Sequence, residues 1–417
     1  MQAFKRLTLA LGAILILLVA SAVGAPHLFF MAGLLVALAG ISYLLGLLSQ
    51  RGLTFRREMP AMAWEGEEGI LVYSVTNPTR LFRFFLMIRE PFPEWIEMLE
   101  VEPPLFNVAG MDTTRVGISV RFRKRGVYRV EWFDVTALDP LGVFAFTRRV
   151  PCEGEIVVYP MPQAMGSMPL SGQERNGWQE FSAAALRGNS VDPDGVRNYV
   201  PGDPLRRIHW RQTARTGSLS VIEFEEPQAV NLVIALDLLR GTEVGQGTET
   251  TLEYAVRLAA TIAQQATEQG ASVRLLLPSP KDTRDANALA NTFGRGEEHL
   301  YRLLDSLARV EADTVMPLSE VLTSSLQVLP AGTTLIAMTA SPEPGLVEAL
   351  SRFTVNGGSV ALIYVDPVSF GAKDGKSMEA AQAVLADLLT VNVQTFVLRS
   401  NAFGDVLPEV AYVRTNN

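Results

Sequence analysis

The sequence predicts a chain in three structural parts: an N-terminal two-helix transmembrane hairpin, a β-sandwich-like middle region and a C-terminal α/β doubly wound domain. Three observations lead to this prediction. Two apolar runs without Asp, Glu, Lys or Arg fill most of the first 50 residues. Short alternating runs, typical of antiparallel strands, follow as far as about Pro162. From Asn231 onward, continuous apolar runs alternate with helical patterns, as in a parallel sheet covered by helices.

Length, charge and cysteine content exclude several classes of protein. The chain has 417 residues, which is room for two or three domains, and its net charge is −8. Nucleic-acid binders are usually basic, so we predict no nucleic-acid partner. Cys152 is the single cysteine. This excludes an internal disulfide framework and argues against a thiolate metal site.

Residues 1–50 have the pattern of two membrane-spanning helices. The apolar runs Leu7–Ala25 and Leu28–Leu48 are each close to the roughly 20 residues that a helix needs to cross the hydrocarbon layer. Pro26-His27 lies between them, so we expect a very short loop without Lys or Arg. Basic residues flank the outer ends of the runs: Lys5, Arg6, Arg51, Arg56 and Arg57. The positive-inside rule then predicts a two-pass protein of a bacterial-type inner (plasma) membrane, with both termini and the soluble domains in the cytoplasm.

Two other interpretations of the N-terminal segment stay open. Lys5-Arg6, the first apolar run and Ala20-Ser21-Ala22 also resemble a cleaved signal peptide. In that case the second run acts as a stop-transfer segment, and the soluble region still stays in the cytoplasm. A helical hairpin buried in a protein core is the weaker alternative, because no charged residue interrupts either run.

Residues 51–163 are expected to form a β-rich domain. Alternating runs occupy residues 70–75, 115–120, 128–132 and 156–159. Turn residues such as Asp139-Pro140 separate the runs, which favours an antiparallel sandwich that acts as a spacer or docking surface. A basic run comprises Arg121, Arg123, Lys124 and Arg125. We interpret this run as a solvated strand face, and contact with an anion or a lipid headgroup is the alternative.

Residues 229–417 alternate strands and helices. The first strand, Leu232–Leu236, is a continuous apolar run that ends at Asp237, and Thr250 with Glu253 forms a capping-box pattern at the start of the next helix. Further strands are expected at Val273–Leu277, Thr334–Met338, Val360–Val365 and Val393–Leu398. Further helices are expected at His299–Arg309, Leu318–Val328, Gly345–Phe353 and Met378–Leu389.

The end of the first of these strands is similar to the metal loop of von Willebrand factor A-type domains. There, an Asp-x-Ser-x-Ser loop helps to bind a divalent cation, because Mg²⁺ prefers oxygen ligands. Here Asp237 is followed by Leu239 and Gly241 at the serine positions, with Arg240 between them, and Thr339-Ala340-Ser341 stands where a second aspartate is expected. We therefore predict a von Willebrand factor A-like domain without a metal. Asp237 is a degenerate metal-loop position. Without a metal, we expect its carboxylate to cap the next segment or to pair with an arginine. Arg240 is a candidate to fill the position of the missing cation.

Residues 164–228 contain a dense polar motif, in which the turn Pro201-Gly202-Asp203 precedes several arginines, a histidine and a tryptophan. The motif resembles the family called domain of unknown function 58. The matching residues are Arg197, Tyr199, Pro201, Gly202, Asp203, Arg207, Ile208, His209, Trp210, Thr213, Ala214, Arg215, Gly217, Leu219 and Glu223. Upstream, Arg125-Gly126-x-Tyr128 and Asp139-Pro140-Leu141-Gly142-x-Phe144 are also similar to that family.

The resemblance implies an interaction partner. Members of the family often accompany MoxR-type AAA+ ATPases and are thought to act in assembly, maturation or stress responses at the envelope. We therefore predict a membrane-anchored interaction protein whose partners are such an ATPase and the lipid bilayer, with no cofactor. The sequence leaves the oligomeric state open. The expected binding residues are Arg197, Tyr199, Pro201, Gly202, Asp203, Arg207, His209, Trp210, Arg211, Ala214, Arg215 and Glu223.

The motif has two physical interpretations. Arginine forks can bind carboxylates or phosphates on a partner, or they can pair internally with nearby acids. For His209 we predict no catalytic role, because the sequence offers no nucleophile elbow and no zinc-ligand spacing. The sequence also lacks a P-loop, so we predict that the chain does not itself hydrolyse ATP by that route. A hydrolase that uses His209, and a module that binds anionic lipid through the arginines, are the alternatives.

Overall fold

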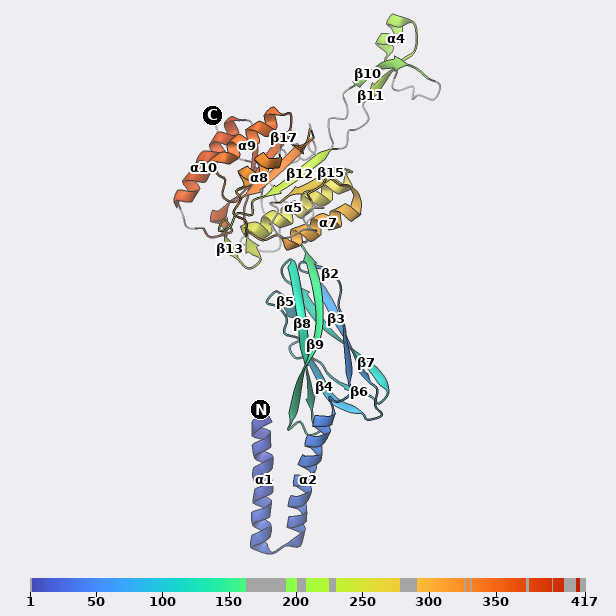
Figure 1. The fold of residues 1–417 in the computed structure, drawn as a ribbon, viewed down its shortest axis with the longest axis vertical. Helices are drawn as coiled ribbons and strands as arrows, with labels where there is room; N and C mark the ends of the chain where they lie inside the picture. Colours follow the sequence, from blue (N-terminus) through green and yellow to red (C-terminus); the bar gives the residue numbers. More distant parts are fainter. Residues whose placement is uncertain are drawn as a thin grey trace. The chain divides into compact units, whose positions relative to one another are not determined.

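The chain folds into two compact units, Met1–Tyr159 and Pro160–Asn417. The structure is a computed structural model that describes residues 2–162, 193–200, 208–224, 230–277, 291–325, 328–330, 332–372, 375–391, 393–400 and 410–412. Figure 1 shows the elements of both units in sequence colours.

The first unit begins with two antiparallel helices, α1 (Gln2–Val23) and α2 (Pro26–Leu48). Both are long and apolar enough to cross a membrane, with a mean hydropathy of 2.3 over Phe4–Val23 and over Pro26–Leu48. The predicted loop at Pro26-His27 was wrong by two residues. The turn is made at Gly24-Ala25, with Gly24 at φ 67°, and Pro26 begins α2. Proline is accepted there because the first helical position needs no backbone N–H.

A β-rich region follows in the same unit and consists of two sheets. The first sheet has the order β1 (Thr54–Glu58), β3 (Glu68–Asn77), β7 (Asp112–Phe122) and β5 (Ile96–Met98). The second has the order β2 (Met62–Trp64), β9 (Ala145–Tyr159), β8 (Gly126–Leu138), β4 (Arg83–Arg89) and β6 (Leu105–Val108). All pairs are antiparallel except β2 with β9.

One apolar core joins the two sheets. Tyr73 and Ile118 from the first sheet pack in the same buried cluster as Ile88, Phe133 and Val135 from the second. Buried and exposed positions alternate along β3 and β8, as the sequence pattern predicted for strands with one face on a core.

The second unit contains a mostly parallel sheet. Its order is β15 (Ser272–Leu276), β12 (Asn231–Leu236), β16 (Thr334–Thr339), β17 (Ser359–Val365), β18 (Gln394–Leu398) and β19 (Val410–Tyr412). The first five strands are parallel, and β19 pairs antiparallel with β18. The strands expected from the apolar runs are present within one or two residues of their expected bounds. A short hairpin, β13 (Gly245–Gln246) and β14 (Glu249–Thr250), precedes the first helix of this region.

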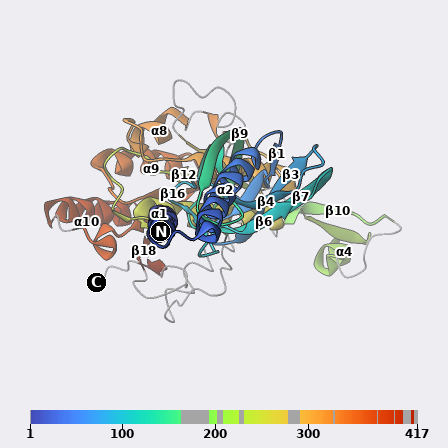
Figure 2. The same cartoon turned by 90° about the horizontal axis from the view of Figure 1, so that it is seen from below.

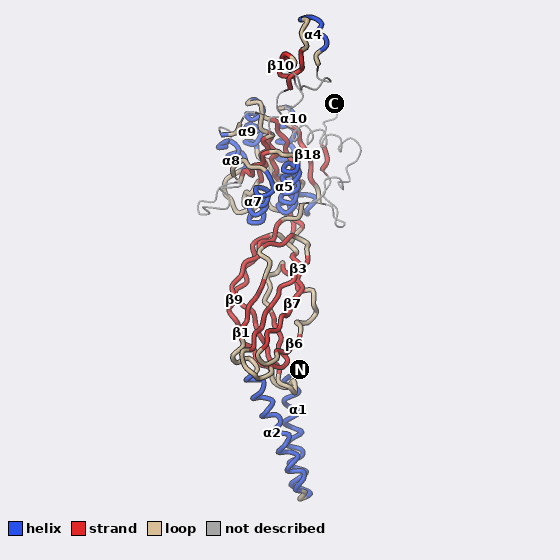
Figure 3. The backbone as a smooth tube through the Cα atoms, turned by 90° about the vertical axis from the view of Figure 1, so that its right-hand side faces the viewer, coloured by secondary structure: helices blue, strands red, loops and turns tan. Residues whose placement is uncertain are grey.

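Helices pack against this sheet, as Figures 2 and 3 show. They are α5 (Thr251–Glu268), α7 (Gly296–Arg309), α8 (Leu318–Ser325), α9 (Pro344–Val355) and α10 (Gly375–Thr390), with a 3-10 turn η4 (Pro367–Phe370). Val233 and Ala235 of β12 share a core with α8, α9 and α10. The alternate strand residues Leu232, Ile234 and Leu236 are also buried, and α5 contacts β12, β15 and β17. Both faces of β12 are therefore covered, because neighbouring strand residues point to opposite faces.

Candidate functional site

The polar motif of the second unit forms a small antiparallel ladder with one helix. Strand β10 (Pro193–Asn198) pairs with β11 (Ser220–Phe224), with Arg197 opposite Val221 and Gly195 opposite Glu223. Tyr199 extends this ladder, since its N–H donates to the carbonyl of Leu219 at 2.8 Å. Ile208, whose side chain is buried, makes a further bridge to Val221. Residues far apart in the motif therefore meet at β11.

His209 begins the helix α4 (Trp210–Thr216) as its N-cap. Its Nδ1 accepts a hydrogen bond from the backbone N–H of Gln212 at 3.0 Å, and its own backbone N–H donates to the carbonyl of Ser220 at 2.8 Å. Thr213 joins the helix to β11, because its Oγ1 accepts from the N–H of Ser220 at 3.0 Å. Gly217 ends α4 at φ 71°, a left-handed conformation that favours glycine. A cap at each end gives this short helix a defined position on the ladder.

The helix presents an aromatic and cationic face. Trp210 is 66% exposed, and Arg211, Ala214 and Arg215 are exposed as well. Within the described residues, neither Arg211 nor Arg215 forms an ion pair. We call Trp210, Arg211 and Arg215 the α4 surface. The other predicted binding residues Pro201, Gly202, Asp203 and Arg207 lie outside the described residues, and Arg197 and Glu223 are described only as members of the ladder.

The capping role of His209 leads to a prediction. His209→Ala removes the acceptor for the N–H of Gln212 and is expected to destabilise α4 by about 1 kcal/mol, whereas His209→Asn keeps a capping oxygen and is expected to cost less. Hydrogen–deuterium exchange at residues 212–216 measures this difference. Equal exchange in both variants and in the unmodified chain would contradict the capping role.

A second candidate site lies at the ends of the parallel strands. Asp237 follows β12, accepts a hydrogen bond from Thr339 Oγ1 at 2.6 Å through Oδ2, and accepts one from the N–H of Leu239 at 3.1 Å through Oδ1. Burial raises the pKa of Asp237, the hydrogen bonds from Thr339 and Leu239 partly oppose this rise, and the charge of Glu343 adds to it. The adjoining pocket is lined by Asp237, Thr242, Glu243, Thr251, Leu252, Ala255, Ala312, Met338, Thr339, Ala340 and Val365.

The expectation that Arg240 fills the cation position beside Asp237 is not met. Arg240 is exposed, and in the part of the chain that the structure describes it makes no ion pair with Asp237. Its backbone N–H instead donates to the carbonyl of Thr314 at 2.8 Å. The side chain of Asp237 caps its own loop at Leu239. The described residues include no group of three or more His, Cys, Asp or Glu side chains that could hold a metal ion, and the absence of a metal stays a prediction.

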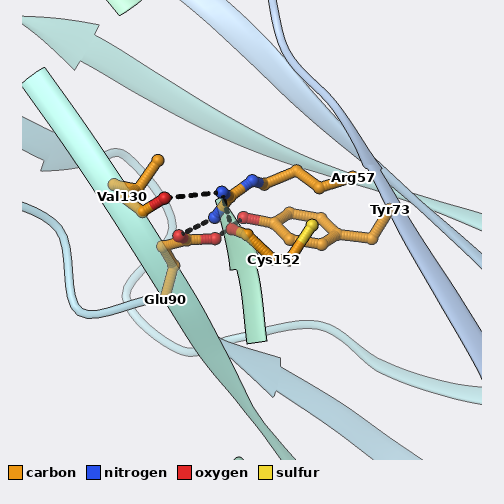
Figure 4. Close-up of polar contacts among 5 residues, drawn as sticks. All are labelled: Arg57, Tyr73, Glu90, Val130 and Cys152. Carbon is orange, nitrogen blue, oxygen red and sulfur yellow. Dashed lines mark hydrogen bonds and ion pairs between the residues drawn. The ribbon is translucent and has the colours of Figure 1, made fainter. Parts of the chain in front are cut away.

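A buried charged network lies in the β-rich region, and the sequence did not reveal it (Figure 4). Arg57 forms an ion pair with Glu90, and the two side chains are 1% and 0% exposed. Tyr73 donates its hydroxyl to the other carboxylate oxygen of Glu90. Arg57 also donates to the carbonyls of Val130, at 3.0 Å, and of Cys152. Arg57 is one of the basic residues that flank the second apolar run, but its charge is buried in the β-rich region.

The pKa values of this network follow from burial. Burial raises the pKa of Glu90, and the hydrogen bond from Tyr73 and the charge of Arg57 partly oppose that rise. The pKa of Tyr73 is raised by burial and by the neighbouring Glu90 carboxylate. The alternation of inward and outward positions along a strand could have indicated the buried arginine, because Arg57 occupies an inward position of β1.

The basic run at the end of β7 is only partly a solvated face. Arg121 and Arg123 are exposed and form ion pairs with Glu68 and Glu97, at 2.5 and 3.4 Å. Lys124 lies over the ring of Trp95, 5.3 Å from its centroid. Arg125, in contrast, is buried. The expectation of a solvated face is therefore wrong for Arg125.

The turn after β8 joins the helical hairpin to the β-rich region. The Asp139 carboxylate accepts hydrogen bonds from the N–H groups of Val143 and Phe144, both at 2.7 Å, and from Ser42 Oγ of α2. The ring of Tyr43 packs edge-on against Phe144, with centroids 5.2 Å apart, and against Phe146 at the same distance.

Further contacts complete this junction. Gln50 Nε2 donates to the carbonyl of Val135 at 2.8 Å, and Arg6 lies over the ring of Phe144, 5.2 Å from its centroid. A Cβ added at Gly46 would come within 2.6 Å of the Phe146 ring, so close packing requires glycine there. The Asp139–Phe144 motif, which the sequence singled out without a role, therefore docks the β-rich region on α2.

The architecture therefore combines two apolar helices, a β-rich region and a mostly parallel α/β region that carries the polar motif. The model of the family described as "Protein of unknown function DUF58" matches residues 195–332. This match confirms the resemblance over that range, which begins within β10 and ends just before β16. The two apolar helices and the β-rich region lie outside it.

One curated relative aligns with this chain. It is the uncharacterized protein YeaD of Bacillus subtilis (strain 168), 23% identical over 239 residues. The alignment covers 56% of this chain and 56% of that protein, so the chain spans about half the length of its curated relative.

Two of the solved structures that match this chain have low TM-scores. The ASH/PapD-like domain 7 of human CEP192 has 13% identity and a TM-score of 0.18, and covers 26% of this chain and 88% of that one. Trypsin-activated α2-macroglobulin from Escherichia coli has 12% identity and a TM-score of 0.22, and covers 79% of this chain and 18% of that one. TM-scores this low carry no argument about this chain.

Proposed function

We propose that this protein is a two-pass membrane-anchored interaction protein that presents the α4 surface to a MoxR-type AAA+ ATPase during maturation or stress responses at the bacterial envelope. The observation that carries the proposal is the exposure of Trp210, Arg211 and Arg215 on a helix that is capped at both ends. Tryptophan and arginine are the residues most enriched among those that dominate binding at protein interfaces.

The hairpin serves as the anchor. Its outer ends carry Lys5, Arg6 and Arg51, and its turn at Gly24-Ala25 carries no charge. By the positive-inside rule, the termini and both soluble parts are on the cytoplasmic side of the inner membrane. Arg57 is buried and adds nothing to this bias, which the remaining basic residues still support.

The α/β region is proposed to be a doubly wound, von Willebrand factor A-like domain. The parallel strand order β15, β12, β16, β17 and β18, with helices against both faces of β12, supports this assignment. Asp237 directly follows β12, and Thr339 is the last residue of the neighbouring strand β16, at the point where the chain order of the sheet changes direction. In doubly wound sheets this position is where ligands bind.

An acidic face on the ATPase is the proposed target, because guanidinium groups bind carboxylates in a bidentate manner. Arg211→Gln combined with Arg215→Gln is expected to weaken the complex about tenfold or more, which corresponds to about 1.4 kcal/mol or more. The measurement is titration of the ATPase against the full chain in detergent, at two salt concentrations. The electrostatic part of the affinity should fall as the salt concentration rises.

A matched control variant removes the same two positive charges at a different surface of the chain. Arg302→Gln combined with Arg352→Gln removes two exposed arginines whose ion pairs, among the residues that the structure describes, are with Glu298 and Glu348 on their own helices. Such pairs contribute only about 0.3–0.5 kcal/mol, so this variant should bind like the unmodified chain. Equal weakening in both double variants, or in neither, would refute the α4 surface as the binding site.

An enzyme that uses His209 is the second candidate function. His209 Nδ1 is occupied as an acceptor in the cap, which leaves Nε2 as the ring nitrogen that could face a substrate. This candidate requires a turnover that disappears in both His209→Ala and His209→Asn while α4 stays protected from exchange in the Asn variant.

A further inference from the structure

Exposed apolar side chains gather at one end of the β-rich region. Leu81 is 62% exposed, Met111 is 70% exposed, and Phe82 and Phe84 are also exposed. The Phe82 and Phe84 rings contact each other, with centroids 4.6 Å apart. Large exposed apolar groups that cluster in this way usually mark a contact surface. We call Leu81, Phe82, Phe84 and Met111 the apolar patch.

The apolar patch is formed by two loops that touch each other, residues 78–82 and 109–111, together with the start of β4, which carries Phe84. The N–H of Met111 donates to the carbonyl of Thr79 at 2.8 Å. A Cβ added at Gly110 would overlap the carbonyl oxygen of Arg80, so the backbones of the two loops lie in direct contact. Asn77 fixes the first loop further, because its Nδ2 donates to the carbonyl of Leu81 at 2.7 Å. The patch is therefore a defined surface.

The first loop is fastened to the end of the second apolar helix. Arg83 is buried and donates through Nη1 to the carbonyl of Leu48 at 2.5 Å and through Nη2 to the carbonyl of Arg51 at 2.9 Å. Leu48 is the last residue of the apolar helix α2. The patch thus lies beside the point at which the chain leaves the proposed membrane span.

The residues around the patch have the composition of a membrane interface. Arg80 is exposed and directly precedes Leu81, and Arg51, whose backbone carbonyl accepts from Arg83, is exposed as well. Aromatic and basic residues are enriched at the level of the lipid headgroups, where the rings are partly buried and the cations meet anionic lipid.

We propose that the apolar patch inserts into the interfacial layer of the same bilayer that holds the hairpin. The first unit is then attached to the membrane by α1 and α2 and also by these two loops. The second attachment sets the tilt of the β-rich region relative to the bilayer, because Arg83 couples the loop to α2. This inference rests on the proposed membrane anchoring.

The test uses single cysteines in a Cys152→Ser background, labelled with an environment-sensitive nitrobenzoxadiazole fluorophore. The full chain is reconstituted in vesicles of phosphatidylcholine and phosphatidylglycerol. Leu81→Cys and Met111→Cys report on the patch. Ile70→Cys is the matched control, because Ile70 is 62% exposed, as Leu81 is. Ile70 precedes Asn77 by seven residues on β3, which is about 20 Å along a strand. Phe30→Cys, within α2, reports on the anchor itself.

Labels at Leu81 and Met111 are expected to be quenched by shallow spin-labelled lipid at least about twofold more than the label at Ile70, and to be less accessible to aqueous iodide. The label at Phe30 should be quenched by deeply spin-labelled lipid. If Phe30 is quenched but Leu81 behaves like Ile70, the patch proposal is overturned and the anchor stands.

Two other outcomes are equally decisive. If Phe30 is not quenched by lipid, the membrane anchoring itself is overturned, and the patch proposal with it. If Leu81 and Met111 are protected from iodide without being quenched by lipid, a protein surface covers the patch, and the lipid proposal is overturned.

Discussion

Replacing Glu90 by leucine is expected to lower the free energy of unfolding of the first unit by about 3–5 kcal/mol, because the change leaves a buried guanidinium without its partner. In Glu90→Leu the Arg57 guanidinium stays buried but no longer faces a carboxylate. Its remaining partners are the carbonyls of Val130 and Cys152, which do not neutralise it. Amide exchange of β1 and β8 in the detergent-solubilised chain measures the loss.

Replacing Arg57 by methionine should lower the free energy of unfolding less than Glu90→Leu does, and the loss should depend on pH. In Arg57→Met, Glu90 is buried without a cation, and burial already raises its pKa above the usual value. A raised pKa in the folded state contributes stability that is complete below the unfolded pKa of about 4.3 and is lost as the pH rises through the folded value. Arg57→Met should therefore be more stable near pH 5 than near pH 8.

The double variant Arg57→Met/Glu90→Leu is the control for this pair. Replacing a buried ion pair by apolar residues of similar size is often close to neutral, so the double variant should lose less stability than Glu90→Leu alone. A double variant that is as unstable as the sum of the two single changes would contradict coupling between Arg57 and Glu90.

Replacing Asp139 by alanine is expected to detach the turn after β8 from α2, at a cost of about 3 kcal/mol, because charge-assisted hydrogen bonds are lost and buried donors are left unpaired. The donors are the N–H groups of Val143 and Phe144 and the hydroxyl of Ser42. Amide exchange at residues 141–146 of the full chain in detergent should rise strongly.

The contacts of Asp139 with α2 should depend on pH in the opposite direction to the stability of Arg57→Met. Burial raises the pKa of Asp139, but the hydrogen bonds from Ser42 and from the N–H groups of Phe144, Val143 and Leu141 outweigh it, so the pKa is lowered. A lowered pKa contributes stability that is present above the unfolded value of about 3.9 and is lost as the pH falls through the folded value. The docking should therefore be constant from pH 5 to 8 and weaken only in stronger acid.

Asp139→Asn is the matched variant, because it keeps one acceptor oxygen for the two N–H groups and removes the charge. Its exchange at residues 141–146 should lie between those of the unmodified chain and of Asp139→Ala. Unchanged exchange in Asp139→Ala would show that aromatic packing around Tyr43 holds the junction without the carboxylate.

The sequence by itself determined part of the secondary structure of this protein, namely the two apolar helices, several strands of the β-rich region, and the parallel strands and helices of the α/β region. Charge-free runs identified α1 and α2, and alternating or continuous apolar runs identified the strands, because burial of one or both faces of a strand leaves a direct periodic signature. Thr250 indicated the start of α5, where its Oγ1 accepts from the N–H of Glu253 at 3.2 Å, because a cap is a local interaction between residues three positions apart.

Only the tertiary structure decided which polar residues meet. Arg57 and Glu90 are 33 positions apart, and Ser42 and Asp139 are 97 positions apart. Such pairings depend on strand order and on packing between elements, which no local pattern encodes. His209 combines both cases, because its capping contact with Gln212 is local, whereas the hydrogen bond from its backbone N–H to Ser220 of β11 depends on the ladder. The motif residues were visible in the sequence, but the exposed side of their helix was set by the ladder that supports it.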